Sequence, residues 1–241
     1  MLKNTLLVSR HAVSRLLVAG VVAALSFSVA AALAAEHEHP QPVVLAPGYA
    51  DLQFVPPAAG SYALPALGAA ANGPVLDTQG NARELHDYMG DKITVLSFIY
   101  TRCNDVNGCP LASYVMRRVQ ERLLQEPDLR EQVRLLSFSF DPDYDTPAVL
   151  ADYASRFVAD EFDWQFLTCG SEAQLAGVLR DYNQWIVRDY DAQGRSLGAM
   201  SHLLRVYLID RDKRIRNIYS VSFLHAETIA NDIRTLLAAP A

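Results

Sequence analysis

The sequence has few cysteines and no excess of basic residues, and each absence excludes a class of protein. Three cysteines in 241 residues are too few for a disulfide scaffold. A chain of this length can form a hydrophobic core without disulfides, so the cysteines are not needed as structural cross-links. Lysine and arginine total 21 against 27 aspartate and glutamate residues, which gives a formal net charge of −6. No basic stripe is present in the sequence, and we therefore expect no nucleic-acid partner.

The long apolar run of the sequence lies at its N-terminus, where Leu16–Leu33 consists of apolar and small residues. Three basic residues precede this run: Lys3, Arg10 and Arg15. Residues 32–34 form the small-x-small pattern that signal peptidase cuts, so we predict a secretory signal peptide over residues 1–34 and a periplasmic protein. The alternative is an uncleaved anchor, because the 20 residues 16–35 match the length of a membrane-spanning helix. Only this anchored form would contact a membrane, and export permits disulfides in both forms.

Prolines are concentrated directly after this leader. Seven of the twelve prolines lie in residues 35–75, together with many alanines and glycines. This composition favours an irregular N-terminal arm that lies over a domain.

Residues 76–241 differ in their sequence pattern: predicted strands alternate with predicted helices, and no internal repeat is present. We expect strands over residues 93–100, 133–140, 164–168, 202–210 and 214–222, and helices from Pro110, from Pro147, over 171–186 and over 224–239. The order of these elements predicts one α/β domain with a central mixed sheet flanked by helices.

The stretch FIYTRCNDVNGCPL, residues 98–111, places two cysteines between a buried strand and a helix. A helix N-terminus carries partial positive charge and free N–H groups, which stabilise a thiolate at Cys103 or Cys109. Thiolates attack disulfides and bind soft metals. The order strand, cysteine pair, helix is that of the thioredoxin fold. From spacing alone, the pair is compatible with a structural disulfide, a redox couple or two ligands of a metal site.

Four segments, FIYTRC…CPL, FDPDYDTPAVLADYASRF, WQFLT and SHLLRVYLID, resemble in this order the signature segments of the Sco/SenC family. The members of that family are thioredoxin-fold copper-binding proteins of the bacterial periplasm and the mitochondrial intermembrane space. The resemblance runs from about residue 76 to residue 237. It implies a thioredoxin-like fold and a copper site formed by Cys103, Cys109 and His202.

The resemblance also implies a function, which is to deliver copper to cytochrome c oxidase or to keep the cysteines of that target reduced. The expected partner is a copper-receiving protein, either a cytochrome oxidase subunit or another copper enzyme. Delivery would proceed by ligand exchange, in which the partner's thiolates or imidazoles replace the site's ligands one at a time. Asp141 and Pro142 match the family motif after the second buried strand, and the resemblance places them near the site.

The sequence departs from the family pattern at two points. Five residues separate Cys103 from Cys109, whereas the family usually has three; Asn107-Gly108 is a turn former that can absorb the extra length. We expect the longer spacer to alter the geometry of the site, the reduction potential of the cysteine pair and the choice of partner protein. We do not expect it to alter the set of copper ligands. Cys169 stands where the family usually has a small residue, and we expect it to be a core residue and not a ligand.

A thiol-disulfide oxidoreductase is the alternative function, because a thiolate at a helix N-terminus also suits exchange chemistry. Reductases of this fold usually have two residues between their cysteines, so this alternative ranks second. A third possibility is an interaction domain with a structural disulfide between Cys103 and Cys109. A peroxidase is excluded, because Leu96 and Tyr100 occupy the proline and threonine or serine positions of the peroxiredoxin pattern.

The predicted cut raises a separate hypothesis about the new N-terminus. Cleavage after Ala34 would leave a chain that begins Ala35-Glu36-His37, with His39 close behind. The free amine, two backbone amides and the imidazole of His37 form a square-planar nitrogen set, which Cu(II) favours. A cut one residue later would remove this arrangement.

Overall fold

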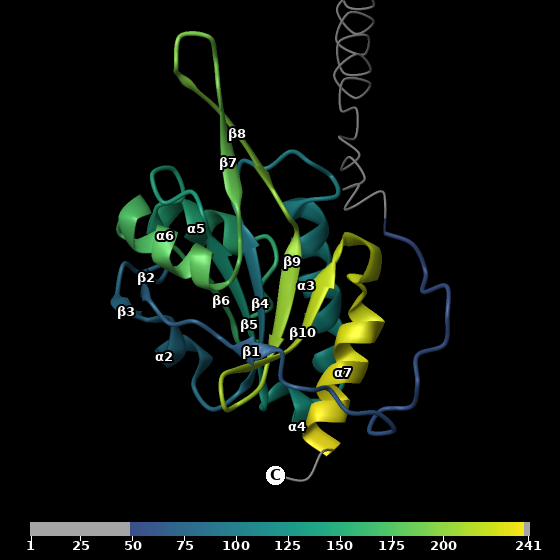
Figure 1. Cartoon of the computed structure of the whole chain (residues 1–241). Helices are drawn as coiled ribbons and strands as arrows, with labels where there is room; N and C mark the ends of the chain where they lie inside the picture. Colours follow the sequence, from purple (N-terminus) through teal and green to yellow (C-terminus); the bar gives the residue numbers. More distant parts are fainter. Residues whose placement is uncertain (1–48, 239–241) are drawn as a thin grey trace, which may run out of the picture. The chain divides into compact units, whose positions relative to one another are not determined.

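The computed structural model describes residues 49–238 (Figure 1). The predicted signal peptide (residues 1–34), the first part of the proline-rich arm (residues 35–48) and the histidines His37 and His39 lie outside the described residues. Within residues 49–238, no helix is long and apolar enough to cross a membrane.

A six-stranded mixed sheet forms the centre of the described domain. Its strands, in spatial order, are β1 (Gly68–Ala69), β10 (Arg214–Ser220), β9 (Arg205–Ile209), β4 (Ile93–Ile99), β5 (Val133–Ser139) and β6 (Trp164–Leu167). Strand β4 runs parallel to β5 and antiparallel to β9. The predicted α/β class with a central mixed sheet is therefore confirmed.

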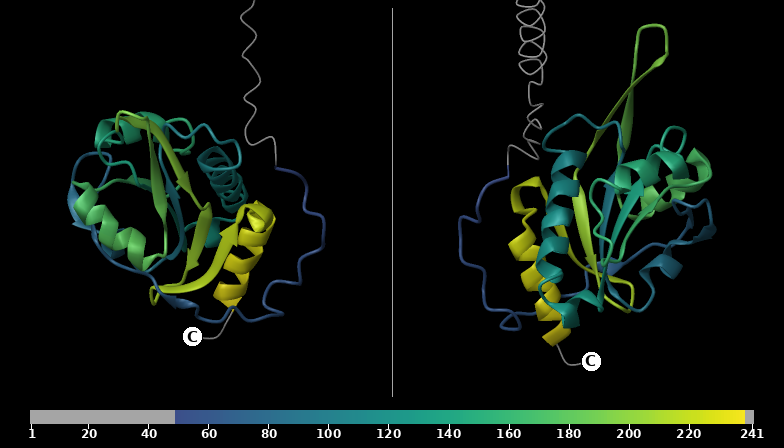
Figure 2. Two further views of the ribbon diagram at one scale, coloured as in Figure 1. Left: turned by 45° about the horizontal axis from the view of Figure 1, so that its top comes forward. Right: turned by 180° about the vertical axis from the view of Figure 1, so that it is seen from behind.

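Helices cover both faces of this sheet. Helices α3 (Cys109–Leu123) and α7 (Ala226–Ala238) lie on one face, and α5 (Pro147–Ala154) and α6 (Glu172–Asp181) lie on the other (Figures 1 and 2). Because both faces are covered, the central strands can be apolar along their whole length, and all seven residues of β4 are buried. The smaller elements are α2 (Leu85–Met89), α4 (Pro127–Arg130), the strands β2 (Pro74–Leu76) and β3 (Ala82–Glu84), and the 3-10 helix η1 (Val221–Phe223).

Two helices begin at the residues that the sequence indicated. Pro110 lies in the first turn of α3, where its missing N–H costs no helical hydrogen bond. Thr146 is the N-cap of α5, and its side chain accepts a hydrogen bond from the backbone N–H of Val149. Helix α3 therefore begins at the second cysteine of the pair, at the end of the sheet where β4 and β5 finish.

The structure differs from the sequence prediction between residues 182 and 204. Helix α6 ends at Asp181 instead of continuing to residue 186, because Asn183 adopts a left-handed conformation with φ of 53°. The chain then forms a hairpin of β7 (Ile186–Tyr190) and β8 (Ser196–His202), which the sequence analysis did not predict. The strand expected over 202–210 is consequently divided, with His202 at the end of β8 and β9 starting at Arg205.

The described part of the proline-rich arm runs along the domain and supplies its edge strand β1. Two of its contacts reach the C-terminal half of the chain: the Tyr62 hydroxyl donates to Asp232 over 2.5 Å, and Arg216 Nε donates to the carbonyl of Leu64 over 2.7 Å. Strand β1 pairs with β10 through Gly68 and Ala69.

Candidate metal centre

The two cysteines lie on either side of a tight turn between β4 and α3. Cys109 is the first residue of α3 and is fully buried, whereas Cys103 is partly exposed. The five-residue spacer is folded back on itself, because the backbone N–H groups of Asn107 and Gly108 donate to the side chain and the carbonyl of Asp105, over 3.0 and 2.8 Å. The longer spacer therefore still brings the two thiols together.

Gly108 has a specific role in this turn. A Cβ atom at this position would lie 3.3 Å from Cys103 Sγ and 3.2 Å from the carbonyl oxygen of Asp105. Both distances are shorter than ordinary van der Waals contacts, so a larger residue would push the sulfur of Cys103 out of place.

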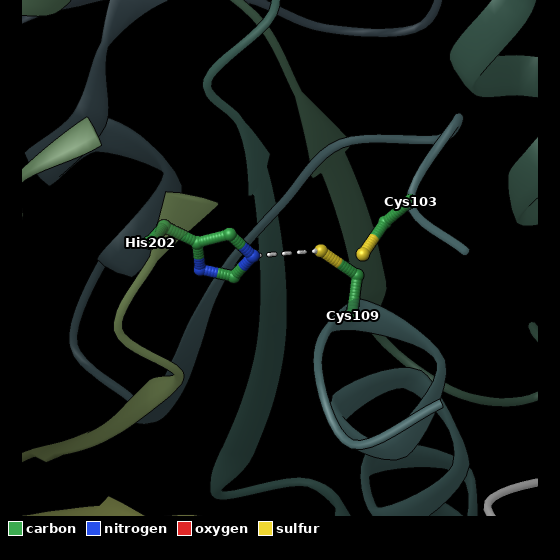
Figure 3. A group of neighbouring side chains, drawn as sticks. All are labelled: Cys103, Cys109 and His202. Atoms are coloured by element: carbon green, nitrogen blue, oxygen red, sulfur yellow. Dashed lines mark hydrogen bonds between the residues drawn. The ribbon is translucent and has the colours of Figure 1, made fainter. Parts of the chain in front are cut away.

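His202 reaches the cysteines from the end of β8. Its Nε2 lies 3.5 Å from Cys109 Sγ, and the three ligand atoms of Cys103, Cys109 and His202 all lie within 4.8 Å of one another (Figure 3). The imidazole ring packs edge-on against the ring of Phe140, with 4.8 Å between the centroids. All three residues predicted as copper ligands are thus in one place, and both thiols are free.

The two thiols differ in their ionisation. Hydrogen bonds from Cys109 and then from His202 lower the pKa of Cys103 to about 4, against the opposing effect of burial. Burial raises the pKa of Cys109 well above its ordinary value, and the neighbouring Cys103 thiolate adds to this rise. At neutral pH the pair therefore holds one thiolate, at Cys103, and one thiol, at Cys109. A metal ion that binds both sulfurs must displace the proton of Cys109.

The donor set fits a soft or borderline metal ion. Thiolate and imidazole ligands lie about 2.0–2.3 Å from such an ion, and three donor atoms within 4.8 Å of one another can reach a single ion with small side-chain movements. Two thiolates and one imidazole suit copper in particular. Three protein ligands also leave room for a further ligand on the exposed side of Cys103.

Asp141 and Pro142 follow β5, next to the cysteine loop. The carboxylate of Asp141 is buried and accepts a 2.6 Å hydrogen bond from Arg102, the residue before Cys103. Pro142 is half-buried, and its side chain carries no ligand atom. The resemblance placed both residues near the site, and the contact with Arg102 gives Asp141 a defined link to the Cys103 loop.

Three further residues, which the sequence patterns did not indicate, support the cysteine loop and the strand that carries His202. Asp145 is fully buried and accepts hydrogen bonds from the backbone N–H of Thr101 over 3.0 Å and from the Ser139 hydroxyl over 2.5 Å. Tyr100 and Arg188 contact the strand that carries His202. Asp145 lies in the same FDPDYD segment as Asp141, but the pattern alone did not indicate that its carboxylate turns back onto the cysteine loop.

Cys169 is separate from this centre. It is buried, its Sγ donates to the carbonyl of Pro74 over 3.3 Å, and burial raises its pKa to about 12. It therefore behaves as the core residue that we predicted.

Fold and site together define a thioredoxin-like domain in which two cysteines and one histidine are grouped closely enough to hold a metal ion. Residues 74–238 match the SCO1/SenC family model, and the chain belongs to this family. The chain is 25% identical over 145 residues to the SCO1 protein homolog of Bacillus subtilis (strain 168). This match covers 60% of this chain and 70% of that protein.

Solved structures give the same result. ScoI of Bradyrhizobium japonicum, solved with copper bound, is 26% identical; the match covers 69% of this chain and 98% of that one, with a TM-score of 0.56. A SCO1/SenC family lipoprotein of Bacillus anthracis is 25% identical, with 73% and 99% covered and a TM-score of 0.60. The predicted thioredoxin-like fold and the predicted family are confirmed.

Proposed function

We propose that this protein binds one copper ion through Cys103, Cys109 and His202 and delivers it to a partner protein during the assembly of a cytochrome oxidase or another copper enzyme. The observation that carries the proposal is the convergence of two sulfur atoms and one imidazole nitrogen within 4.8 Å. The similar protein of Bradyrhizobium japonicum has been solved with copper bound. The predicted signal peptide supports a periplasmic location for this step.

The difference in exposure between the ligands suggests an order of events. Cys103 is the thiolate and is partly exposed, so an arriving copper ion meets it first. Cys109 and His202 then complete the centre as the buried thiol loses its proton. Release runs in the opposite direction: a ligand of the partner enters beside Cys103, and Cys109, which is fully buried, is the last sulfur to leave the copper ion.

A thiol-disulfide oxidoreductase is the second candidate. It is favoured by two free thiols at a helix N-terminus, one of which, Cys103, has a pKa lowered to about 4. Such a thiolate can attack a disulfide of a client, and Cys109 can then resolve the mixed disulfide. Both functions use the same two sulfurs, and they differ in their need for His202.

Complementation distinguishes these two functions. In cells that lack the protein, we would measure the copper content of the membrane-bound terminal oxidase after expression of the wild type, Cys103→Ser or His202→Ala. Copper delivery predicts that both variants fail to restore the copper. Restoration by His202→Ala but not by Cys103→Ser would refute delivery and support thiol exchange.

The hypothesis of an N-terminal Cu(II) site needs its own test, because His37 and His39 contribute only if the chain starts at Ala35. Intact mass of the exported protein gives the position of the cut. A mature chain that starts at any other residue removes the basis of this hypothesis.

A further inference from the structure

The ligands of the centre come from two different parts of the fold. Cys103 and Cys109 belong to the segment that follows β4, whereas His202 ends the β7–β8 hairpin. In the described part of the chain, β7 and β8 pair only with each other. Figures 1 and 2 show this hairpin extending beyond the rest of the domain. Strand β9, which begins three residues after His202, pairs with β4 and so holds the chain on the C-terminal side of the histidine. The hairpin itself is not paired with this sheet, so side-chain contacts are left to orient it against the cysteine loop.

The first connection is formed by the buried carboxylate of Asp141, whose side chain is 2% exposed. One oxygen accepts a 2.6 Å hydrogen bond from Arg102, next to Cys103, and the other lies 3.5 Å from Nη1 of Arg188. Arg188 belongs to β7 and pairs in register with Met200 of β8, two residues before His202. Its guanidinium also donates to the sulfur of Met200 over 3.1 Å. Asp141 thus links the cysteine loop to the histidine hairpin.

A glycine in β8 makes room for this link. Gly198 has a φ of 73°, and a Cβ atom at this position would lie 3.1 Å from Nη1 of Arg102. The guanidinium of Arg102 can therefore lie directly against the backbone of β8 while it binds Asp141.

The second connection is the hydroxyl group of Tyr100, a buried residue at the end of β4. It accepts a hydrogen bond from the backbone N–H of Met200 over 3.4 Å and lies 3.5 Å from the carbonyl oxygen of the same residue. The Tyr100 ring also contacts the imidazole of His202, with 6.0 Å between the centroids. Both connections thus reach the hairpin at Met200 or at its pair partner Arg188. Met200 lies two residues before His202, which is about 7 Å along the strand.

We propose that Tyr100, Asp141 and Arg188 are positioning residues, which dock the β7–β8 hairpin onto the cysteine loop and so set the distance between His202 Nε2 and the two sulfurs. The inference rests on the proposed copper binding. It adds that the contribution of His202 depends on these two polar connections as well as on the pairing of β9 with β4.

The positioning role can be tested by comparing Arg188→Met and Tyr100→Phe with two control variants, each of which loses an equivalent interaction elsewhere in the domain. Arg134→Met is the control for Arg188, because both arginines are 21% exposed and Arg134 forms an ion pair with Asp163 near the start of β5. Tyr182→Phe is the control for Tyr100, because Tyr182 is also buried and its hydroxyl donates to the carbonyl of Ala71. Copper affinity of the reduced, exported chain would be measured for each variant with His202 present and with His202→Ala.

We expect Arg188→Met and Tyr100→Phe to weaken copper binding by about 10-fold to 100-fold when His202 is present, as is common for residues that orient metal ligands. In the His202→Ala background Arg188→Met should weaken it by less than about 2-fold, because a residue that acts through His202 has no further effect once the imidazole is gone. Tyr100→Phe should keep a part of its effect there, because the Tyr100 hydroxyl also interacts with Cys103. The two controls should leave the affinity unchanged in both backgrounds. An equal loss in both backgrounds, or an equal loss in the controls, would overturn the proposal.

A second readout needs no copper. Amide hydrogen exchange in β8 of the reduced, metal-free protein should become about 10-fold faster in Arg188→Met and Tyr100→Phe and stay unchanged in the two controls. Unchanged exchange in β8 would overturn the docking role. If the wild type binds no copper, the proposed function fails, and the exchange measurement still decides whether the two connections hold the hairpin.

Discussion

Nε2 of His202 lies 3.5 Å from Sγ of Cys109, although the two residues are 93 positions apart in the sequence. This contact joins the first residue of α3 to the last residue of β8, so the centre exists only when the hairpin and the sheet are both in place. The consequences can be tested at the thiols, at the turn between them and at the buried carboxylates that support it.

Alkylation should distinguish the two cysteines by pH. Because the pKa of Cys103 is lowered to about 4, its reaction with iodoacetamide in the metal-free protein should be nearly constant from pH 6 to 8 and should fall only as the pH drops through about 4. Cys109, with a raised pKa and a fully buried side chain, should stay unmodified over this range. Peptide mass spectrometry of the labelled protein measures both.

The cause of this low pKa can be checked in the same assay. Cys109→Ala removes the largest contribution, a hydrogen bond to the Cys103 thiolate, so the midpoint for Cys103 should move to higher pH. A midpoint that stays near 4 in this variant would show that Cys109 does not stabilise the thiolate.

Gly108→Ala should weaken copper binding by about 10-fold with little loss of stability, because the new methyl group meets the sulfur of Cys103 at 3.3 Å. The control is Gly177→Ala in the middle of α6, where a Cβ atom meets nothing within 4 Å. That change should raise the free energy of unfolding by about 0.5–1 kcal/mol and leave copper affinity unchanged. Copper titration and urea unfolding of the two variants, side by side, provide the comparison.

Asp145→Asn should destabilise the protein by about 1–3 kcal/mol, since an amide offers one acceptor where the buried carboxylate accepts hydrogen bonds from Thr101 and Ser139. Asp143→Asn, at an exposed position of the same turn, serves as the control and should change the free energy of unfolding by less than about 0.5 kcal/mol. Equal effects of the two substitutions in urea unfolding would contradict a supporting role for Asp145.

Cys169→Ser should leave the copper stoichiometry at one ion per chain, because this residue lies outside the group of Cys103, Cys109 and His202. Its sulfur contacts the carbonyl of Pro74, a contact that a serine hydroxyl can keep. Loss of copper in this variant, measured by metal analysis after gel filtration, would place a third sulfur in the centre.

Much of the fold could be predicted from local sequence patterns. The apolar runs of β4 and β5 and the N-cap Thr146 of α5 appear in the structure where the sequence indicated them. The β7–β8 hairpin was missed because the end of α6 depends on a single left-handed residue, Asn183, and because a ribbon with one exposed face has no continuous apolar run.

The site could be predicted only in part. The cysteine pair is visible as a local motif, but His202 was assigned by resemblance to a family, since nothing in its immediate sequence connects it to residues 93 positions away. Tyr100 and Arg188 were not identified, because their contacts with Met200 depend on the hairpin itself.

The central claim, that one copper ion is held by two cysteines and one histidine, is tested most directly by competition titration with Cu(I) against a coloured chelator. The sample would be the reduced chain of residues 35–241 with His37 and His39 changed to alanine, together with Cys103→Ser and His202→Ala in the same background. We predict one tightly bound copper ion per chain, lost in Cys103→Ser and weakened in His202→Ala. A chain that competes no better than Cys103→Ser would contradict the account.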